Sequence, residues 1–270
     1  MNQPTDRDEA EIEASKAPLL DHLIELRKRI IWSLLALAAG FVICFYFANP
    51  IFSFLTAPYV HATHGRADTT LIYTAFTEKF FANARLALFA GLCVSFPVIA
   101  AQVWMFVAPG LYRQERRAFL PFLIASPVLF IVGGAFVYYV MLPFAIRFFL
   151  SFQSTGGQDT ATIKLLPKVS EYLDFVTTLI FAFGLTFQMP VLLSLLGRVG
   201  IVSSSMLRKS RRYAIVGITA LAAIFTPPDI FSMVSLLLPL IVLYEVSILL
   251  VRAIERKRTK EDTAQEPTES

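Results

Sequence analysis

The sequence predicts an all-α polytopic membrane protein with six transmembrane helices and with both termini on the cytoplasmic side. Of the 270 residues, 56% are hydrophobic and 16% are charged, whereas soluble domains carry about 25% charged residues. The charges are clustered, and the stretches between them approach the roughly 20 apolar residues that cross a bilayer. This pattern argues against a large soluble helical protein, which would have to bury nearly every helix on all sides.

Six apolar stretches correspond to the six expected helices. The first four reach or approach the length of a bilayer-spanning helix, but the fifth is stopped early by Pro227 and Pro228. Over residues 213–225 it spans only about 20 Å. The sixth starts at Phe231, and Glu245 near its cytoplasmic end shortens its apolar part. Helices five and six are therefore expected to thin the bilayer or to be shielded by neighbouring protein. The stretches are 30–47, 86–112, 118–146, 175–197, 213–228 and 230–251.

Basic residues alternate between the connections, and this alternation predicts the orientation. Clusters precede the first helix, separate the second from the third and the fourth from the fifth, and follow the sixth; they lie at 27–29, 113–117, 198–212 and 252–260. The other connections carry few basic residues or none. Because arginine and lysine stay on the cytoplasmic side, we expect an even number of spans with both termini inside. No nucleic-acid partner is needed to explain these clusters.

The chain is expected to form one membrane domain, over residues 18–255. An acidic tail, 1–17, precedes it and is expected to be disordered, because its composition offers little apolar surface to bury. A cytoplasmic tail, 256–270, follows it and is expected to be disordered after Lys260. The acidic tail is the opposite of the basic start of a signal peptide, so no cleavable leader is expected.

Prolines and long outer connections predict a curved scaffold of unequal helices rather than a compact pore-forming bundle. The outer segments 49–77 and 151–172 are long enough to fold over the outer face as short helices and turns. The third outer turn is short, and Asp229 can cap the sixth helix. Bends in the second, third and fourth helices are allowed by prolines at positions 97, 121, 127, 143 and 190.

Polar side chains inside the apolar stretches are functional candidates, because they are expensive to leave in lipid. Arg85 is expected to extend toward the outer interface, and Gln102 to bond a neighbouring helix. Gln188 precedes Pro190 near mid-membrane and fits either a bond between helices of the chain or a docking point for a partner helix. Glu245 is expected to pair with a loop arginine.

Residues 18–29 have the pattern of a short amphipathic helix that begins at a proline. Its Glu25 and Arg29 are spaced to form an i, i+4 pair. A carboxylate at a membrane surface rich in cations is also a possible receptor for an arginine ligand, and Glu115 in the second cytoplasmic connection has the same character. Two such carboxylates could each bind a guanidinium in a bidentate fork.

Other chemistry finds little support in the sequence. His61 and His64 lack a third metal ligand, and motifs for nucleotide binding or hydrolysis are absent. We therefore expect no catalytic residue, metal or cofactor. The alternative function is a small-solute secondary transporter, which would need broken helices in symmetric halves and ionisable groups near the midplane. An intramembrane enzyme would need a nucleophile and base, or a metal constellation.

Three motifs follow one another along the chain: H-L-x-E-L-R-x-R at 22–29, F-x-A-P-G-L-Y-x-x-E-R-R at 106–117 and F-T-P-P-D at 225–229. In this order they resemble the TatC family of the twin-arginine translocase. Pro58 and Pro97 also match family positions. The resemblance covers nearly all of residues 18–252, and it implies a TatC-like fold in the bacterial cytoplasmic (inner) membrane.

The resemblance also implies a ligand and its binding site. Relatives act as cytoplasmic-side receptors for signal peptides that bear paired arginines, and transport of the folded cargo would draw on the proton motive force. Glu25 and Glu115 match the recognition positions, with Phe106 nearby. Leu19 and Arg27 belong to the same expected signal-peptide site.

The partners implied by the resemblance are the single-span subunits TatA and TatB, membrane lipid, and further copies of the chain within a translocase complex. Gln188 matches a position that is glutamate in many relatives and contacts these subunits; glutamine cannot titrate but can still form hydrogen bonds. Thr226 and Asp229 lie in the partner-docking region, where Met233 replaces a polar residue of some relatives. Structural roles are expected for prolines at positions 58, 97, 227 and 228.

Overall fold

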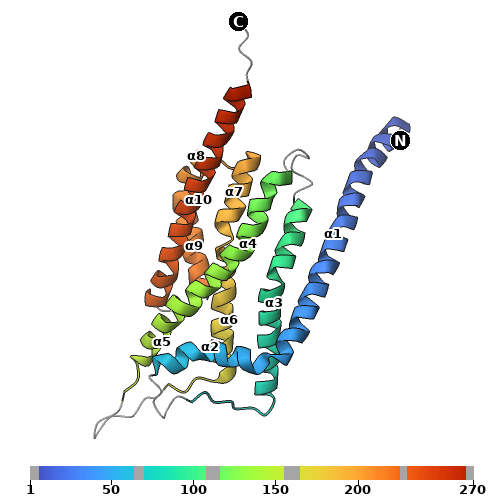
Figure 1. Cartoon of the computed structure of the whole chain (residues 1–270). Helices are drawn as coiled ribbons and strands as arrows, with labels where there is room; N and C mark the ends of the chain where they lie inside the picture. The colour runs from blue at the N-terminus through green and yellow to red at the C-terminus, as the bar shows by residue number, and fades with distance from the viewer. Residues whose placement is uncertain (1–5, 64–69, 108–115, 155–164, 226–229, 266–270) are drawn as a thin grey trace, which may run out of the picture.

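The computed structural model describes residues 6–63, 70–107, 116–154, 165–225 and 230–265, and nearly all regular structure in these ranges is helical (Figure 1). An isolated parallel bridge joins Ile72 to Lys168. The helices are α1 Asp6–Tyr46, α2 Ala48–Ala62, α3 Glu78–Val107, α4 Arg116–Phe136, the π-helical η3 Val137–Met141, α5 Leu142–Leu150, α6 Val169–Thr186, α7 Met189–Val199, α8 Ser204–Lys209, α9 Arg211–Phe225 and α10 Ile230–Gln265.

Five helical segments within the described ranges are long and apolar enough to cross a membrane. The expected multi-pass, all-helical architecture is thereby confirmed. The fifth expected helix corresponds to α9, which has 15 residues and a length of about 22 Å. It is shorter than each of the five segments that are long enough to cross a membrane. Those five segments are His22–Tyr46, Glu78–Phe106, Pro121–Leu150, Val169–Val199 and Leu236–Lys257.

Prolines interrupt two of these segments, as their positions predict. The Val169–Val199 segment divides into α6 and α7 just before Pro190, which cannot donate a backbone hydrogen bond. The Pro121–Leu150 segment contains the wider turn η3 immediately before Pro143. In contrast, α3 continues through Pro97 and α2 through the buried Pro58.

Both terminal helices are longer than the sequence predicts. Helix α1 begins at Asp6, inside the tail expected to be disordered, and α10 continues beyond Lys260 to Gln265. The N-terminal extension is rich in alanine and glutamate, which have high helix propensity, and each extension continues an existing helix, so no new nucleation is required. Residues 1–5 and 266–270 lie outside the described ranges.

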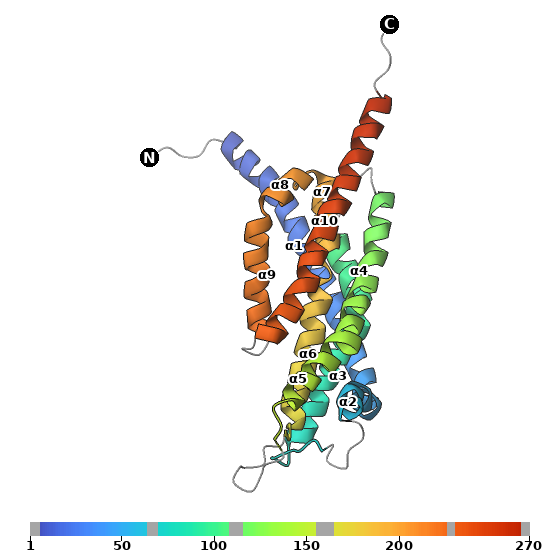
Figure 2. The same cartoon turned by 90° about the vertical axis from the view of Figure 1, so that its left-hand side faces the viewer.

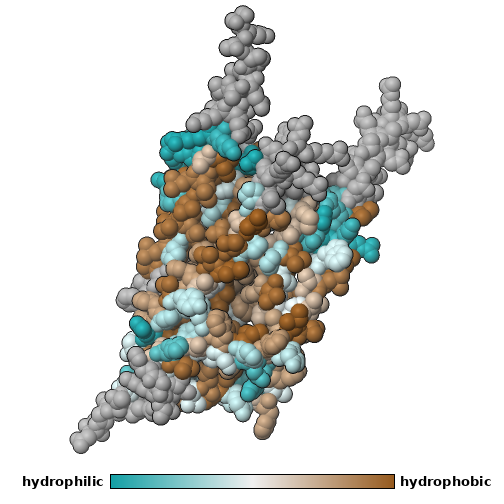
Figure 3. Space-filling model, viewed as in Figure 1, coloured by the Kyte–Doolittle hydropathy of each residue, from teal (hydrophilic) through white to brown (hydrophobic). Residues whose placement is uncertain are grey.

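The N-terminal end of α1 and the C-terminal end of α10 lie at the same end of the bundle, and α2 crosses the opposite end (Figure 1). Two tyrosine hydroxyls hold α2 there: Tyr138 donates to the Phe54 carbonyl and Tyr172 to the Leu55 carbonyl, each at 2.8 Å. Hydrophobic side chains cover most of the visible surface between the more hydrophilic ends (Figure 3). A band of this kind is what a lipid bilayer would contact.

The hydrophobic core lies in the middle of the bundle and extends into the contact between α7 and α10. Val137, Val176, Phe183 and Ile248 are almost completely buried. Helix α1 stands apart from this core and packs mainly along α3. Figure 2 shows α9 and the N-terminal part of α1 on one side of the bundle and α4 on the other.

Candidate functional site

The candidate site lies where the N-terminal half of α1 meets the C-terminal end of α3. His22, Glu25 and Arg29 share one face of α1 because their spacing of three and four residues matches the helical repeat. The facing residues are Gln102 and Phe106, one turn apart on α3. This end of the bundle also holds the described ends of α1 and α10 (Figure 1).

Arg29 connects the two helices. Its Nη2 donates to Glu25 Oε1 at 2.9 Å, and its Nη1 donates to Gln102 Oε1 at 3.2 Å. The same Nη1 lies 3.7 Å from Met105 Sδ. The side chains of Arg29 and Glu25 are 25% and 29% exposed, so the pair lies at the edge of the packed region. The expected Glu25–Arg29 pair and the expected bond from Gln102 to another helix are both confirmed.

Phe106 is held beside this pair by a ring contact. The His22 and Phe106 rings stack with their centroids 4.3 Å apart and an interplanar angle of 19°. Phe106 is half-buried, whereas His22 is exposed. Phe106 thus contacts the residue one turn before Glu25, and its role in the expected site stays a prediction. His22 is a further residue beside the expected site, and its i, i+3 spacing to Glu25 is the signal in the sequence that could have found it.

The other residues expected in the signal-peptide site are less completely described. Arg27 is exposed on α1. Leu19 lies in α1, but its side chain is outside the described part of the structure. Glu115 lies outside the described ranges, which stop at Val107 and resume at Arg116. Whether Glu25 and Glu115 face the same ligand stays a prediction.

Gln188 is buried and bonded within the chain. Its Nε2 donates to the Ser126 backbone carbonyl at 2.9 Å, and the Ser126 hydroxyl donates to Gln188 Oε1. Both ends of the amide thus contact α4, as the interpretation of Gln188 as a bond between helices predicts. A role for Gln188 in partner docking stays a prediction. The docking and structural residues at 226–229, Thr226, Pro227, Pro228 and Asp229, lie outside the described ranges.

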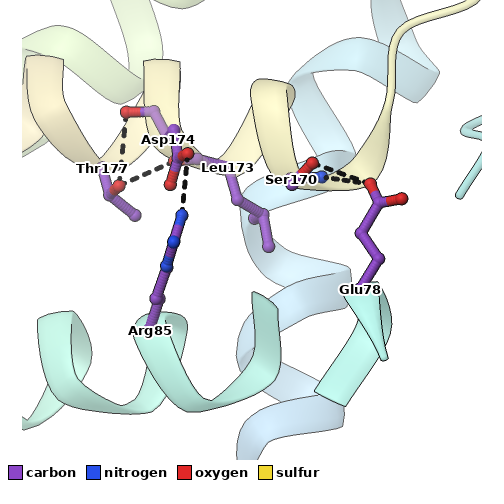
Figure 4. Close-up of polar contacts among 6 residues, drawn as sticks. All are labelled: Glu78, Arg85, Ser170, Leu173, Asp174 and Thr177. Atoms are coloured by element: carbon purple, nitrogen blue, oxygen red, sulfur yellow. Dashed lines mark hydrogen bonds and ion pairs between the residues drawn. The ribbon is translucent and has the colours of Figure 1, made fainter. Parts of the chain in front are cut away.

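Charged residues at the opposite end of the bundle join α3 to α6 (Figure 4). Arg85 Nη1 lies 3.2 Å from Asp174 Oδ2. Glu78 Oε1 accepts a hydrogen bond from the Ser170 hydroxyl at 2.7 Å. The sequence predicts that Arg85 extends toward the outer interface; in the structure its side chain is exposed and is paired with an acidic residue of α6.

Glu245 also has the expected kind of partner. Its Oε2 lies 2.7 Å from Arg211 Nη2, at the start of α9. Among the side chains that the structure describes, no three histidine, cysteine or acidic residues are grouped as metal ligands.

Comparison with known proteins identifies the family. The family model described as "Sec-independent protein translocase protein (TatC)" matches residues 21–239. A Magnetococcus marinus protein named Sec-independent protein translocase protein TatC is 47% identical over 93% of this chain and 90% of its own length. The Escherichia coli protein of the same name is 38% identical over 87% of this chain and 88% of its own length.

A solved structure agrees with the sequence relatives. The crystal structure titled as that of the twin-arginine translocase receptor TatC superimposes with a TM-score of 0.75 at 38% identity. The match covers 87% of this chain and 99% of that one.

Proposed function

This chain belongs to the TatC family of Sec-independent protein translocase proteins, and from this premise we propose that it is the receptor for twin-arginine signal peptides. Membership makes the chain a multi-pass membrane subunit of the twin-arginine translocase, a protein-transport component. The proposal adds the ligand, the partners and the orientation. It has the chain bind signal peptides of folded proteins at the cytoplasmic face of the bacterial inner membrane.

The observation that carries the proposal is the environment of Glu25. Its carboxylate is partly exposed at one end of the bundle, one turn from His22, whose ring stacks on the half-buried ring of Phe106. A carboxylate can accept two parallel hydrogen bonds from a guanidinium, which makes it a suitable receptor for arginine. Glu115 is proposed to supply the second carboxylate, and Leu19 and Arg27 to contact the rest of the peptide.

The orientation requires α9 to be a sixth, short span. The described ends of α1 and α10 lie at the same end of the bundle, and α9 and α10 run in opposite directions beside each other (Figure 2). An even number of crossings brings both ends to one side. The basic clusters make this side the cytoplasmic one, and exposed Arg208, Lys209 and Arg212 lie there.

The partners in this proposal are TatA and TatB, further copies of the chain and the surrounding lipid. Helix α9 is the surface proposed to contact a partner or lipid. Val216, Leu221 and Ile224 are exposed apolar residues on it, and the helix is too short to span the full hydrocarbon core. Gln188, Thr226 and Asp229 are the proposed partner-contact residues. Thinning of the membrane beside α9 would ease passage of the cargo, and the proton motive force is the proposed energy source.

Charge reversal tests the recognition site. Glu25→Lys combined with Glu115→Lys should weaken binding of a synthetic twin-arginine signal peptide to the purified protein by at least about tenfold. The direct measurement is fluorescence anisotropy of the labelled peptide. Glu171→Lys is the matched control, because Glu171 is an exposed carboxylate at the opposite end and its reversal should leave binding unchanged.

Intact peptide binding in the double variant would contradict the proposed recognition site. Ion-coupled uptake of a small solute by vesicles containing the protein would instead favour a secondary transporter.

A further inference from the structure

We propose that Arg29 determines the specificity of the Glu25 site by occupying the carboxylate as an internal guanidinium. A signal peptide must then replace or share a guanidinium contact that the chain already makes. This inference rests on the proposed function and deepens it, because it assigns a reason why arginine rather than lysine is recognised.

The contacts of Arg29 support its role as an internal occupant. Arg29 Nη2 lies 2.9 Å from Glu25 Oε1, the geometry that a ligand arginine would adopt. Its other terminal nitrogen is held on α3 by Gln102, at 3.2 Å. Arg29 would therefore keep contacts on α3 after leaving Glu25, and its displacement would break one ion pair rather than a whole network.

The carboxylate is not fully occupied by this contact. Arg29 binds Glu25 Oε1, and Glu25 Oε2 has no hydrogen-bond partner among the side chains that the structure describes. A carboxylate has room for about four hydrogen bonds. An incoming guanidinium can thus dock on the second oxygen while Arg29 keeps the first.

Arginine and lysine ligands differ in how well they can compete. A guanidinium is planar and weakly hydrated, so it can bind the second oxygen of Glu25 beside Arg29 without displacing it. An ammonium is a compact, strongly hydrated charge, so it must displace Arg29 to gain a comparable contact, and the broken Arg29–Glu25 contact lowers the affinity of the lysine ligand alone. Exposed Arg27 and Lys28 add positive charge to this part of α1, which disfavours any cationic ligand that gains little from Glu25.

The test compares two signal peptides that differ only at the arginine pair, one with Arg-Arg and one with Lys-Lys. Full-length protein in detergent micelles carries either the native Arg29 or Arg29→Gln. We expect Arg29→Gln to tighten binding of the Lys-Lys peptide by about fivefold and of the Arg-Arg peptide by about twofold or less, because an ion pair near the surface contributes up to about 1 kcal/mol. The affinity ratio between the peptides should therefore fall.

Lys28→Gln is the matched control, because it removes the same charge from an exposed neighbour for which no contact with Glu25 is found among the described residues. It should tighten both peptides equally and leave their affinity ratio unchanged. Arg29→Lys keeps the charge but loses the second terminal nitrogen that bonds Gln102, and it should lower the ratio by less than Arg29→Gln does.

Equal weakening of both peptides by Arg29→Gln, with an unchanged melting temperature, would overturn the inference, because Arg29 would then support the site rather than compete for it. If Arg29→Gln unfolds the protein, Gln102→Ala is the variant that tests the inference, because it removes the hydrogen bond from Arg29 to α3 and keeps the charges of Arg29 and Glu25. An unchanged ratio in Gln102→Ala would then overturn the inference. Glu25→Gln separates the two proposals: if it does not weaken the Arg-Arg peptide, the proposed recognition site itself fails.

Discussion

Polar side chains between the helices have partners that lie far away in the sequence. Arg29 bonds Gln102, Arg85 pairs with Asp174, and Gln188 bonds Ser126. The sequence identified Gln102 and Gln188 as side chains that need a partner in an apolar segment. It could not select the partner, because helical periodicity places a residue on a face without saying which helix covers that face.

Gln188 and Ser126 provide a test of such a bond. Gln188→Leu should lower the stability of the protein by about 1 kcal/mol, because it removes a buried hydrogen-bonding group and leaves the Ser126 hydroxyl without its acceptor. Thermal unfolding in detergent measures this loss. Ser126→Ala completes a double-mutant cycle, and the two losses should be less than additive. Full additivity would show that the Gln188–Ser126 contact contributes nothing to stability.

Prolines, which lack a backbone N–H donor, and glycines, which lack a side chain, shape the helices of this chain. Prolines accompany the α6–α7 break and the π-helical turn η3, and both bends were predictable from Pro190 and Pro143. The close approach of α1 to α3 was not predictable. It depends on Gly40 and Gly91 meeting across the interface, and neither glycine lies in a sequence motif that indicates such a contact.

Gly91→Ala tests the role of this close approach. An added Cβ would lie 2.6 Å from the Phe41 backbone nitrogen and 2.8 Å from the Gly40 carbonyl carbon, so the backbones must separate. We expect a loss of about 1–3 kcal/mol, the range for overpacking, and weaker signal-peptide binding because α1 and α3 together form the site around Glu25. Thermal unfolding and peptide anisotropy measure the two effects.

Gly217→Ala is the matched control, since a Cβ there meets nothing within 4 Å. It should stabilise α9 by up to about 1 kcal/mol through higher helix propensity. A Gly91→Ala protein as stable as the Gly217→Ala protein would contradict the close-packing argument.

At the scale of the whole molecule, the sequence predicted membrane insertion, helix order and the short fifth helix. These features follow from apolar length and from prolines, which are local properties. It could not predict that α1 would stand apart from the core and pack mainly along α3. That arrangement depends on contacts between distant helices. It matters for the proposed function because the face of α1 that carries Glu25 and Arg29 packs against α3.

The crossing of α9 decides the orientation of the molecule, and cysteine labelling tests it. The two native cysteines lie inside the bundle, one buried and one half-buried, so they should react little with a membrane-impermeant maleimide. In spheroplasts, Glu171→Cys and Thr226→Cys should be labelled from outside. Lys28→Cys, Arg212→Cys and Arg256→Cys should react only in inverted vesicles, because basic residues stay on the cytoplasmic side. Labelling of Thr226→Cys from the same side as Arg212→Cys would mean that α9 does not cross, which would leave five spans and place the two termini on opposite sides of the membrane.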